Sequence, residues 1–331
     1  MTYGNNEMSI TLISSVFEHL KSIIKDSIHL FWSLVKVMIP VMIAVKVAQD
    51  LGVIDTLALW LSPLMGIVGL PEQAGLVWVS ALLVNIYGGA AVFIGILPNL
   101  EITVAEVTVL WSMVLIAHAL PVEQRIAQKA GASFWFTAAL RFFGALIYGA
   151  GLNAIYKAGG WLQQPLELAW LPQLEDTSKA TWADWTWSNV QSLFWVFVII
   201  VVLLVVLKLF DLLKITDLLS KVLTPILRVM GIEGRATTLT MFGTLLGLTY
   251  GGALIIKEAQ AGHVAKKDIF LSLCFMSLCH SLIEDTLFVM ALGADASGVL
   301  LGRFIFSVVV VAIIAAGLNK FQRPFPSTHQ N

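Results

Sequence analysis

Residues Phe194 to Leu209 read FWVFVIIVVLLVVLKL, an apolar run interrupted only by Lys208. A helix needs roughly 20 predominantly apolar residues to cross about 30 Å of hydrocarbon, so this run and its flanks predict a membrane-spanning helix. The whole chain of 331 residues is 58% hydrophobic and 12% charged, with a mean hydropathy of +0.86. Soluble domains carry about 25% charged residues. The composition therefore excludes a water-soluble globular protein and predicts an all-α integral membrane protein.

The chain repeats one hydrophobic unit at an interval of about 162 residues. Matched segments keep their order in the two copies: Leu61-Ser62-Pro63 with Leu223-Thr224-Pro225, Tyr87-Gly88-Gly89-Ala90 with Tyr250-Gly251-Gly252-Ala253, His118-Ala119-Leu120 with His280-Ser281-Leu282, and Arg141-Phe142 with Arg303-Phe304. We divide the chain into an amphipathic N-terminal helix (1–28), repeat 1 (29–157), a Trp-rich periplasmic linker (158–189), repeat 2 (190–320) and a cytoplasmic tail (321–331). The alternative for residues 1–28 is the front end of a long first spanning helix.

Matched loops of the two copies differ in their basic residues. Residues 46–72 contain one base and residues 208–235 contain five, while residues 98–106 contain none against three in residues 257–267. The third pair reverses, because residues 125–129 hold two bases and their counterpart holds only acids. Cytoplasmic loops carry the excess of Lys and Arg, so corresponding loops are expected on opposite sides of the membrane.

The basic residues place the first two loops of each copy on one side of the membrane. The apolar segment between these two loops must therefore not cross the membrane. Residues 74–97 and 236–256 each carry Tyr-Gly-Gly, and glycine permits a sharp reversal, so we expect two re-entrant helical hairpins. Kinked spanning helices remain the alternative. Two inverted-topology repeats then each have three crossings, one hairpin and a short amphipathic surface helix around Pro63 or Pro225, with both termini cytoplasmic. The six crossings are expected at 29–48, 104–119, 132–156, 190–209, 269–283 and 297–319.

The succession of a proline-containing amphipathic stretch, a Tyr-Gly-Gly hairpin and a His-x-Leu helix end resembles the Gate (nucleoside recognition) domain family. That family is known from spore maturation proteins A and B, the membrane region of the ferrous iron transporter B and the concentrative nucleoside transporters. The likeness occurs once per copy, around residues 54–93 and 215–256, so the chain looks like a double-Gate protein. The resemblance implies the hairpin architecture and a role in solute passage. It supplies no substrate, because no nucleoside-binding set of side chains maps onto this chain.

Ionisable residues inside apolar segments are costly and therefore mark candidate functional positions. For ion or proton coupling the candidates are His118 and Glu123 in copy one and His280, Glu284 and Asp285 in copy two. A helix would place His280 and Glu284 on one face, and Pro121 is expected to break the helix just after His118. The alternative is acids at the headgroup level and histidines that cap helix ends.

Two further sets of residues complete the candidate site. Arg141 and Arg303 are matched between the copies and are expected to pair with Glu123 and Asp285 or to hold an anionic substrate, a structural ion pair being the alternative. The substrate-binding candidates lie at the hairpin tips, where half-helix ends meet in inverted-repeat transporters: Asn85, Tyr87, Gly88, Gly89, Thr249, Tyr250, Gly251 and Gly252. Glycine used only for tight helix packing is the alternative there.

No HExxH, Gly-x-Ser-x-Gly, CxxC or phosphate-loop motif occurs, so we expect no enzyme activity, no cofactor and no metal site. The leading hypothesis is a transporter or permease-like protein of the bacterial cytoplasmic (inner) membrane for a small polar or nucleoside-like solute, with proton or cation coupling left open. The alternatives are a non-transporting scaffold of the spore maturation type and, less favoured, an intramembrane enzyme. The expected partners are the solute and the lipid bilayer, not nucleic acid, and a homo-oligomer stays open.

Overall fold

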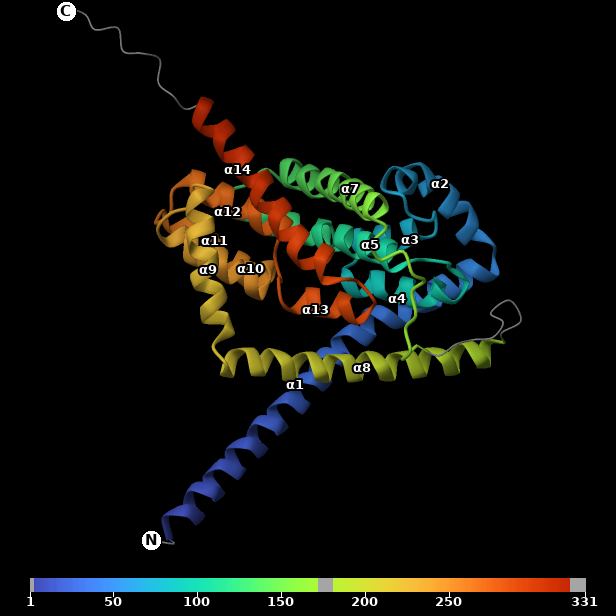
Figure 1. Cartoon of the computed structure of the whole chain (residues 1–331), viewed down its shortest axis with the longest axis horizontal. Coiled ribbons are helices and arrows are strands. Elements are labelled where there is room, and N and C mark those ends of the chain that lie inside the picture. Colours follow the sequence, from blue (N-terminus) through green and yellow to red (C-terminus); the bar gives the residue numbers. More distant parts are fainter. Residues whose placement is uncertain (1–2, 172–180, 322–331) are drawn as a thin grey trace, which may run out of the picture.

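The computed structural model describes residues 3–171 and 181–321. Within these ranges the side chains of residues 3–20, 22, 55, 211, 216, 217, 246, 248–253 and 321 lie outside the description. Figure 1 shows a bundle of helices in which α5 and α12 lie inside and α8 runs along the outside.

The described chain folds into the same order of helices twice. The first half contains α1 (Tyr3–Asp50), α2 (Val53–Val68), α3 (Ala74–Leu83), α4 (Ile86–Ile96), the short 3-10 turn η1 (Leu97–Asn99), α5 (Val104–Ile116), α6 (Leu120–Lys129) and α7 (Phe134–Gly159). The second half contains α8 (Trp182–Leu212), α9 (Ile215–Val229), α10 (Arg235–Leu246), α11 (Leu248–Ala261), α12 (Lys266–Leu278), α13 (Glu284–Ala291), the π-helical turn η2 (Ser297–Gly302) and α14 (Arg303–Phe321). The matched order agrees with the internal repeat of the sequence.

Five helical stretches of the described residues are long and apolar enough to cross a membrane: Ile23–Asp50, Val104–Lys129, Phe134–Gly159, Trp182–Phe210 and Ser297–Lys320. The chain is an all-α integral membrane protein. The remaining expected crossing, 269–283, was wrong as a continuous helix, because α12 ends at Leu278 and has only 13 residues. The first half shows the same interruption, since α5 ends at Ile116 within the stretch Val104–Lys129.

The peripheral helices present their apolar side chains to the outside. Large exposed hydrophobic residues include Trp32 on α1, Phe143 on α7, Phe194 on α8 and Ile313 on α14. The apolar window of Val104–Lys129 is instead 78% buried, against 17% for that of Trp182–Phe210. The exposed apolar surface of the peripheral helices suits contact with lipid. The high buried share of the Val104–Lys129 window identifies α5 as the central helix.

One end of the bundle gathers the segments that are rich in basic residues. Ala127 and Ala130 of the first half pack with Ile255 of the second, and the Lys267 ammonium donates to Asn319 Oδ1 at 2.7 Å. The turns that meet there carry Arg125, Lys129, Lys257, Lys266, Lys267 and Lys320. In Figure 1 this end, with α9 and α11, lies at the left.

The opposite end gathers segments with few basic residues, Lys46 of α1 and Lys157 in the last turn of α7 being at this end. Val104 N donates to Gln164 O at 3.0 Å and Leu166 N to Ile102 O at 2.9 Å, so the start of the linker lies across the start of α5. Residues 98–106 and 158–171 contain no lysine or arginine. The charge asymmetry predicted from the loops is therefore an asymmetry between the two ends of the folded bundle.

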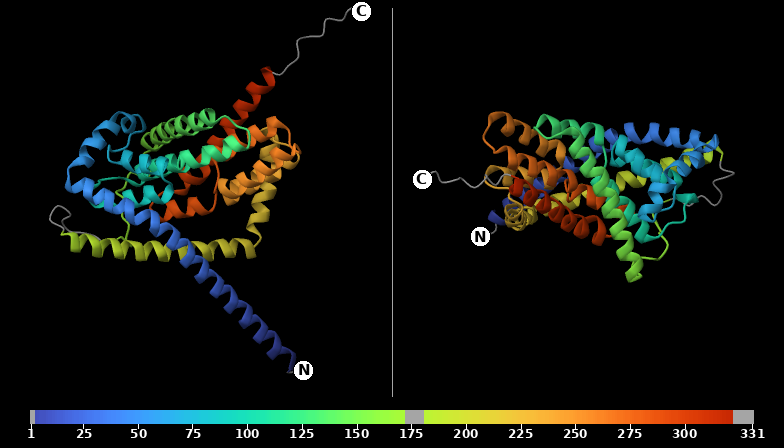
Figure 2. Two further views of the ribbon diagram at one scale, coloured as in Figure 1. Left: turned by 180° about the vertical axis from the view of Figure 1, so that it is seen from behind. Right: turned by 90° about the horizontal axis from the view of Figure 1, so that it is seen from above.

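Each half contains a helical hairpin formed by two short helices. In the first hairpin α3 packs against α4, and a Cβ added at Gly89 would lie 2.9 Å from Ala81 Cβ and 3.2 Å from Val77 O. The hairpin α3–α4 lies toward the end with α2 and the hairpin α10–α11 toward the end with α9, as both views in Figure 2 show. The two hairpins therefore enter the bundle from opposite ends.

The glycine pair does not make the reversal, which corrects our expectation. In the first hairpin the chain turns at Val84 and Asn85, and Gly88 and Gly89 lie inside α4. Asn85 is extended and its side-chain oxygen accepts a hydrogen bond from Gly88 N at 2.9 Å, which caps α4. In the second hairpin the break lies at Gly247, whose φ is 95°. Gly89 instead allows the close approach of the two half-helices.

Candidate functional site

Two histidines lie at the breaks of the central helices. His118 lies between α5 and α6, and His280 between α12 and α13. The residue that follows each histidine, Ala119 or Ser281, is left-handed, with φ of 46° and 49°. That conformation is unfavourable for a residue with a Cβ. Its occurrence at both matched positions indicates that the breaks are specified features of the fold.

A backbone hydrogen bond ties each break to the hairpin of its own half. Ala119 N donates to Ala81 O in α3 at 2.8 Å, and Leu282 N donates to Thr244 O in α10 at 2.8 Å. Each bond satisfies a carbonyl near the end of the first half-helix of a hairpin, where the helix itself provides no partner. The histidines are thus fixed relative to both hairpins.

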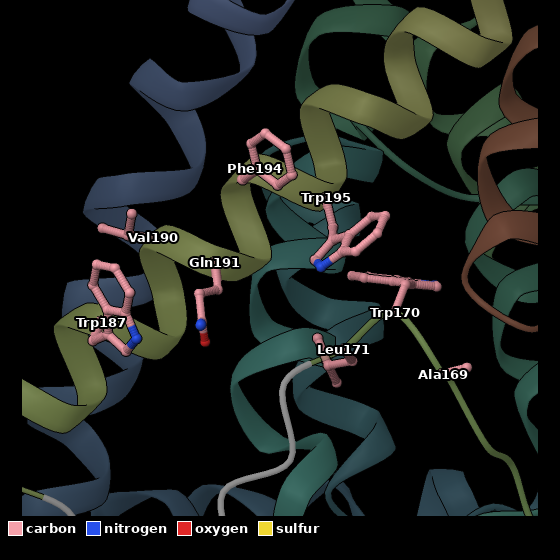
Figure 3. Close-up of a pocket in the computed structure, with 8 residues that line it drawn as sticks. All are labelled: Ala169, Trp170, Leu171, Trp187, Val190, Gln191, Phe194 and Trp195. Carbon is pink, nitrogen blue, oxygen red and sulfur yellow. The ribbon is translucent and has the colours of Figure 1, made fainter.

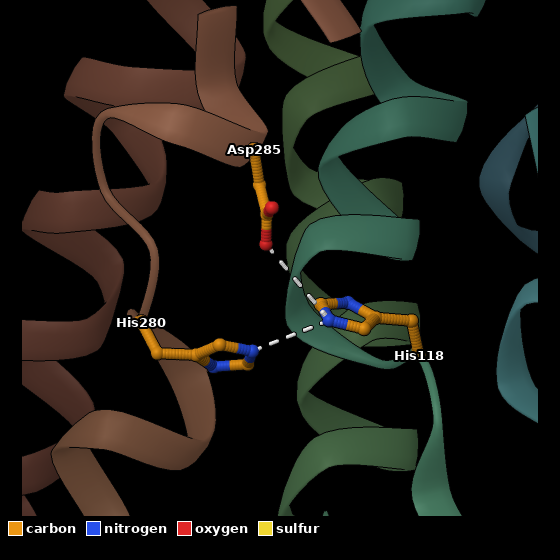
Figure 4. A group of neighbouring side chains, drawn as sticks. All are labelled: His118, His280 and Asp285. Carbon is orange, nitrogen blue, oxygen red and sulfur yellow. Dashed lines mark hydrogen bonds and ion pairs between the residues drawn. The ribbon is translucent and has the colours of Figure 1, made fainter. Parts of the chain in front are cut away.

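The two imidazole rings meet across the interface of the halves. His118 Nε2 and His280 Nε2 are 3.3 Å apart, and Figure 4 shows the rings approaching from the α5–α6 and the α12–α13 connections. Each Nδ1 faces a backbone carbonyl, Val114 O at 2.9 Å and Met276 O at 2.8 Å. A carbonyl oxygen only accepts, so each Nδ1 carries the hydrogen and each Nε2 of a neutral ring carries a lone pair.

Carboxylates complete this polar centre. Glu123 Oε1, from the first turn of α6, lies 3.3 Å from His118 Nε2 and 3.5 Å from His280 Nε2. Asp285 Oδ2, from the first turn of α13, lies 4.0 Å from His118 Nε2. Both histidines and Glu123 are buried, and Asp285 is nearly so. The expected pairing of His118 with Glu123 is therefore present, and His280 joins it from the other half.

The matched arginines are both fully buried but differ in their partners. Arg141 Nη1 forms an ion pair with Glu123 Oε2, and its Nε donates to Ile116 O, a free carbonyl at the end of α5, at 2.7 Å. Arg303 Nη2 donates to Thr286 Oγ1 at 3.2 Å, and its Nε and Nη1 have no hydrogen-bond partner among the described residues. The predicted pairing of Arg141 is present, and no ion pair of Arg303 with Asp285 occurs in the described structure.

The two halves differ in the length of their matched acidic side chains, which accounts for this asymmetry between the arginines. His118 and His280 are 162 residues apart, and Glu123 and Asp285 are separated by the same interval. The matched acids therefore occupy equivalent positions, but aspartate is one methylene shorter than glutamate. The shorter side chain is consistent with the longer distance from Asp285 to the imidazole and with the absence of the second ion pair.

The expected helical pairing of His280 with Glu284 was wrong. The spacing of four residues places side chains on one face only within a continuous helix, and α12 ends before His280 while Glu284 begins α13. The nearest charged partner of His280 is instead Glu123, which lies in the other half. The expectation that the helix breaks near Pro121 agrees with the structure, since this proline lies in the first turn of α6.

The tip of the first hairpin lies beside the second half. The Tyr87 ring packs edge-on against Phe288 of α13, with centroids 5.0 Å apart, one turn of helix from Glu284. Leu83, the last residue of α3, and Val84, in the break, are 64% and 40% exposed. Irregular backbone is tolerated at membrane depth where protein or a watery cavity surrounds it. Of the predicted tip residues, Tyr87 thus contacts the second half, while the Asn85 side chain caps α4.

The corresponding candidates of the second hairpin lie in α11. Thr249, Tyr250, Gly251 and Gly252 fall in the first part of α11, and their side chains lie outside the described residues. Gly247, at the break, lies beside Ser281 of the His280 connection, since a Cβ added there would be 3.9 Å from Ser281 Oγ. The second break is therefore also adjacent to the histidine pair.

Comparison with known proteins gives a relative of unknown function. The chain is 28% identical over 291 residues to the uncharacterized membrane protein YvoD of Bacillus subtilis (strain 168), covering 88% of this chain and 92% of YvoD. No family model matches the chain, and no solved structure matches it. The membrane assignment is thus supported from two sides, and the resemblance to Gate domains stays a prediction.

Sequence reasoning missed Gln124. This residue follows Glu123, is completely buried, and neither its amide nitrogen nor its amide oxygen has a hydrogen-bond partner among the described residues. A buried amide without partners is costly, and such a group beside a polar centre is a candidate for ligand contact. The sequence gives no signal for this residue, because Gln124 stands among Glu123, Arg125, Gln128 and Lys129 and is not distinguished from them.

A separate groove lies between the linker and α8. It has a volume of about 660 Å³ and is lined mainly by aromatic and apolar residues: Ala169, Trp170, Leu171, Trp187, Val190, Gln191, Phe194 and Trp195 (Figure 3). Trp170 Nε1 donates to Ala291 O at 3.1 Å, which fastens the linker to the far end of α13. Indole rings favour the membrane interface, so this groove fits the predicted interfacial position of the linker.

Proposed function

We propose that the chain is a membrane permease that moves a small solute along the interface between its two halves. The observation that carries this proposal is the buried contact of His118 with His280, which brings ionisable groups of both halves together at two helix breaks. Ionisable groups inside membrane proteins are costly and usually serve a pathway for ions or substrates. Broken helices that meet between two repeats form the sites of inverted-repeat transporters.

The distribution of charge supports a definite orientation. Basic residues mark the cytoplasmic side, so the end of the bundle with Arg125, Lys257 and Lys320 would face the cytoplasm. Both termini would then be cytoplasmic, the linker would lie on the outer side, and the host membrane would be the bacterial cytoplasmic membrane. The opposed hairpins are consistent with two repeats of inverted topology.

The solute class follows from the groups at the centre and the hairpin tip. Asn85, Tyr87 and Gln124 offer amide and hydroxyl groups suited to a neutral polar solute, and a nucleoside-like molecule is the class implied by the resemblance to Gate domains. Proton or cation coupling would use His118 and His280. We assign no enzymatic reaction to the chain.

The test is solute flux through the purified full-length chain in proteoliposomes, with radiolabelled uridine, adenosine and a panel of small sugars and amino acids as probes. We expect uptake above that of protein-free liposomes for at least one probe. We also expect strong reduction in Tyr87→Ala and no change in His263→Ala, which alters a histidine that is exposed and paired with Glu258. Wild-type liposomes that match protein-free liposomes for every probe would refute the permease and favour the scaffold.

A further inference from the structure

We propose that His118, His280 and Glu123 form a binding site for one divalent transition-metal cation of the Zn²⁺ type. The expectation of no metal site rested on the absence of a sequence motif, and motifs report only ligands that are close in sequence. These three ligands come from two halves of the chain. Binding does not depend on the permease function, whereas a role of the cation as cargo or coupling ion rests on it.

The distances match one face of a tetrahedral site. His118 Nε2, His280 Nε2 and Glu123 Oε1 form a triangle with sides of 3.3, 3.3 and 3.5 Å. Zinc binds nitrogen and oxygen ligands at about 2.0–2.2 Å, which places tetrahedral ligands roughly 3.3–3.6 Å from one another. The three atoms can therefore bind one cation without rearrangement. Asp285 Oδ2, 4.0 Å from His118 Nε2, or a water molecule is available for the fourth position.

Each ligand is oriented by a second contact, as in established metal sites. The Nδ1 of each histidine donates to a backbone carbonyl at 2.8–2.9 Å, which exposes the Nε2 lone pair toward the centre. Metal-ligating histidines nearly always donate their other nitrogen in this way. Glu123 uses Oε2 for the ion pair with Arg141 and leaves Oε1 toward the imidazoles. All three ligand atoms are therefore acceptors that point at one another.

Three converging acceptors need a positive charge among them. A single proton lies between two atoms and leaves the third acceptor facing a lone pair, whereas a central cation interacts with all three. The charged side chains in contact with the centre are Glu123, Asp285 and Arg141, with a net charge of −1 when ionised. Two imidazoles and a carboxylate suit Zn²⁺, Fe²⁺, Co²⁺ or Ni²⁺, whereas Ca²⁺ and Mg²⁺ prefer oxygen ligands alone.

The test uses the tag-free full-length chain in detergent, stripped with a chelator and titrated with Co²⁺ and Zn²⁺. We expect one Co²⁺ per chain with the visible absorption of a tetrahedral site, displaced by Zn²⁺. His118→Gln, His280→Gln and Glu123→Gln should each weaken the affinity by about 100-fold or more, since even loss of a supporting group costs 10–100-fold. His263→Ala, the exposed histidine, should leave the affinity unchanged.

The design separates this inference from the permease. Glutamine variants keep volume and polarity, and size-exclusion profiles and helical circular dichroism identify any variant that does not fold. No Co²⁺ bound by the wild type, an octahedral spectrum, or equal affinity in wild type and all three folded variants would overturn the metal site. Flux of the whole probe panel is measured separately after the same protein is reconstituted into proteoliposomes. Metal binding without flux of any probe would refute the permease alone, and flux without metal binding would refute the site alone.

Discussion

Replacing Arg141 with leucine should destabilise the protein far more than the same change at Arg303. Both guanidinium groups are completely buried and occupy matched positions in the two halves. Arg141 pairs with Glu123 and caps Ile116 O at 2.7 Å, whereas Arg303 makes one hydrogen bond, to Thr286 at 3.2 Å. The pair of variants thus compares a paired buried cation with one that has no ion pair among the described residues.

The magnitude follows from what each change leaves behind. Removing one partner of a buried ion pair typically costs about 3–5 kcal/mol, because the other charge stays buried and unpaired. The freed carbonyl of Ile116 adds roughly 1–3 kcal/mol. Arg303→Leu removes a buried charge and one hydrogen bond, so its effect should lie within about 1 kcal/mol of zero. We expect a difference between the two variants of at least about 3 kcal/mol.

The assay is reversible unfolding in mixed micelles, followed by circular dichroism over a range of SDS fractions. The double variant Glu123→Gln with Arg141→Leu should recover part of the loss, because it removes the unpaired carboxylate as well. Equal destabilisation by Arg141→Leu and Arg303→Leu, or no recovery in the double variant, would show that the Glu123–Arg141 pair does not hold the α5–α6 break in place.

Three further outcomes are expected. Gly89→Ala should lower stability by about 1–3 kcal/mol through overpacking of the first hairpin, whereas Gly66→Ala, a helical position with nothing within 4 Å of an added Cβ, should be neutral or stabilising in the same thermal-shift assay. Glu101→Cys should react with an impermeant maleimide in whole cells and Lys266→Cys only after permeabilisation; labelling of both from the same side would contradict the inverted repeat. Asp285→Glu should stabilise the protein by about 1 kcal/mol, because the longer side chain would bring a carboxylate to Arg303. Unchanged unfolding would show that the shorter side chain of Asp285 is not the reason why Arg303 has no ion pair in the described structure.

Much of the fold could be predicted because it depends on local chemistry. Long apolar runs define spanning helices such as α8, and the position of Pro121 predicts where the first central helix breaks. Repeat-matched ionisable residues in apolar surroundings pointed to His118, Glu123 and Arg141, which the fold does bring together. Burial cost alone was a sufficient signal for these residues, since each would be unfavourable in lipid without a partner.

The remaining features depend on packing between segments that are distant in sequence. Helical periodicity suggested that His280 pairs with Glu284, but the turn after Leu278 carries the imidazole to the first half, and no local pattern encodes that contact. Similarly, Tyr-Gly-Gly predicts the hairpin but not the residues at which its chain turns. Gly89 is needed for the close approach of α3 and α4, which is a tertiary contact. The turn itself is capped locally by the Asn85 side chain.

The polar centre also shows why an internal repeat need not give two equivalent sites. Histidine, acid and arginine recur in both halves, yet the second acid is an aspartate, and its carboxylate stays 4.0 Å from His118 while Glu123 contacts both rings. The carboxylate that satisfies the two imidazoles therefore comes from the first half, and the first arginine holds it in place. Because both histidines share this one acid, the centre is a single asymmetric site at the interface, and neither half can form it alone.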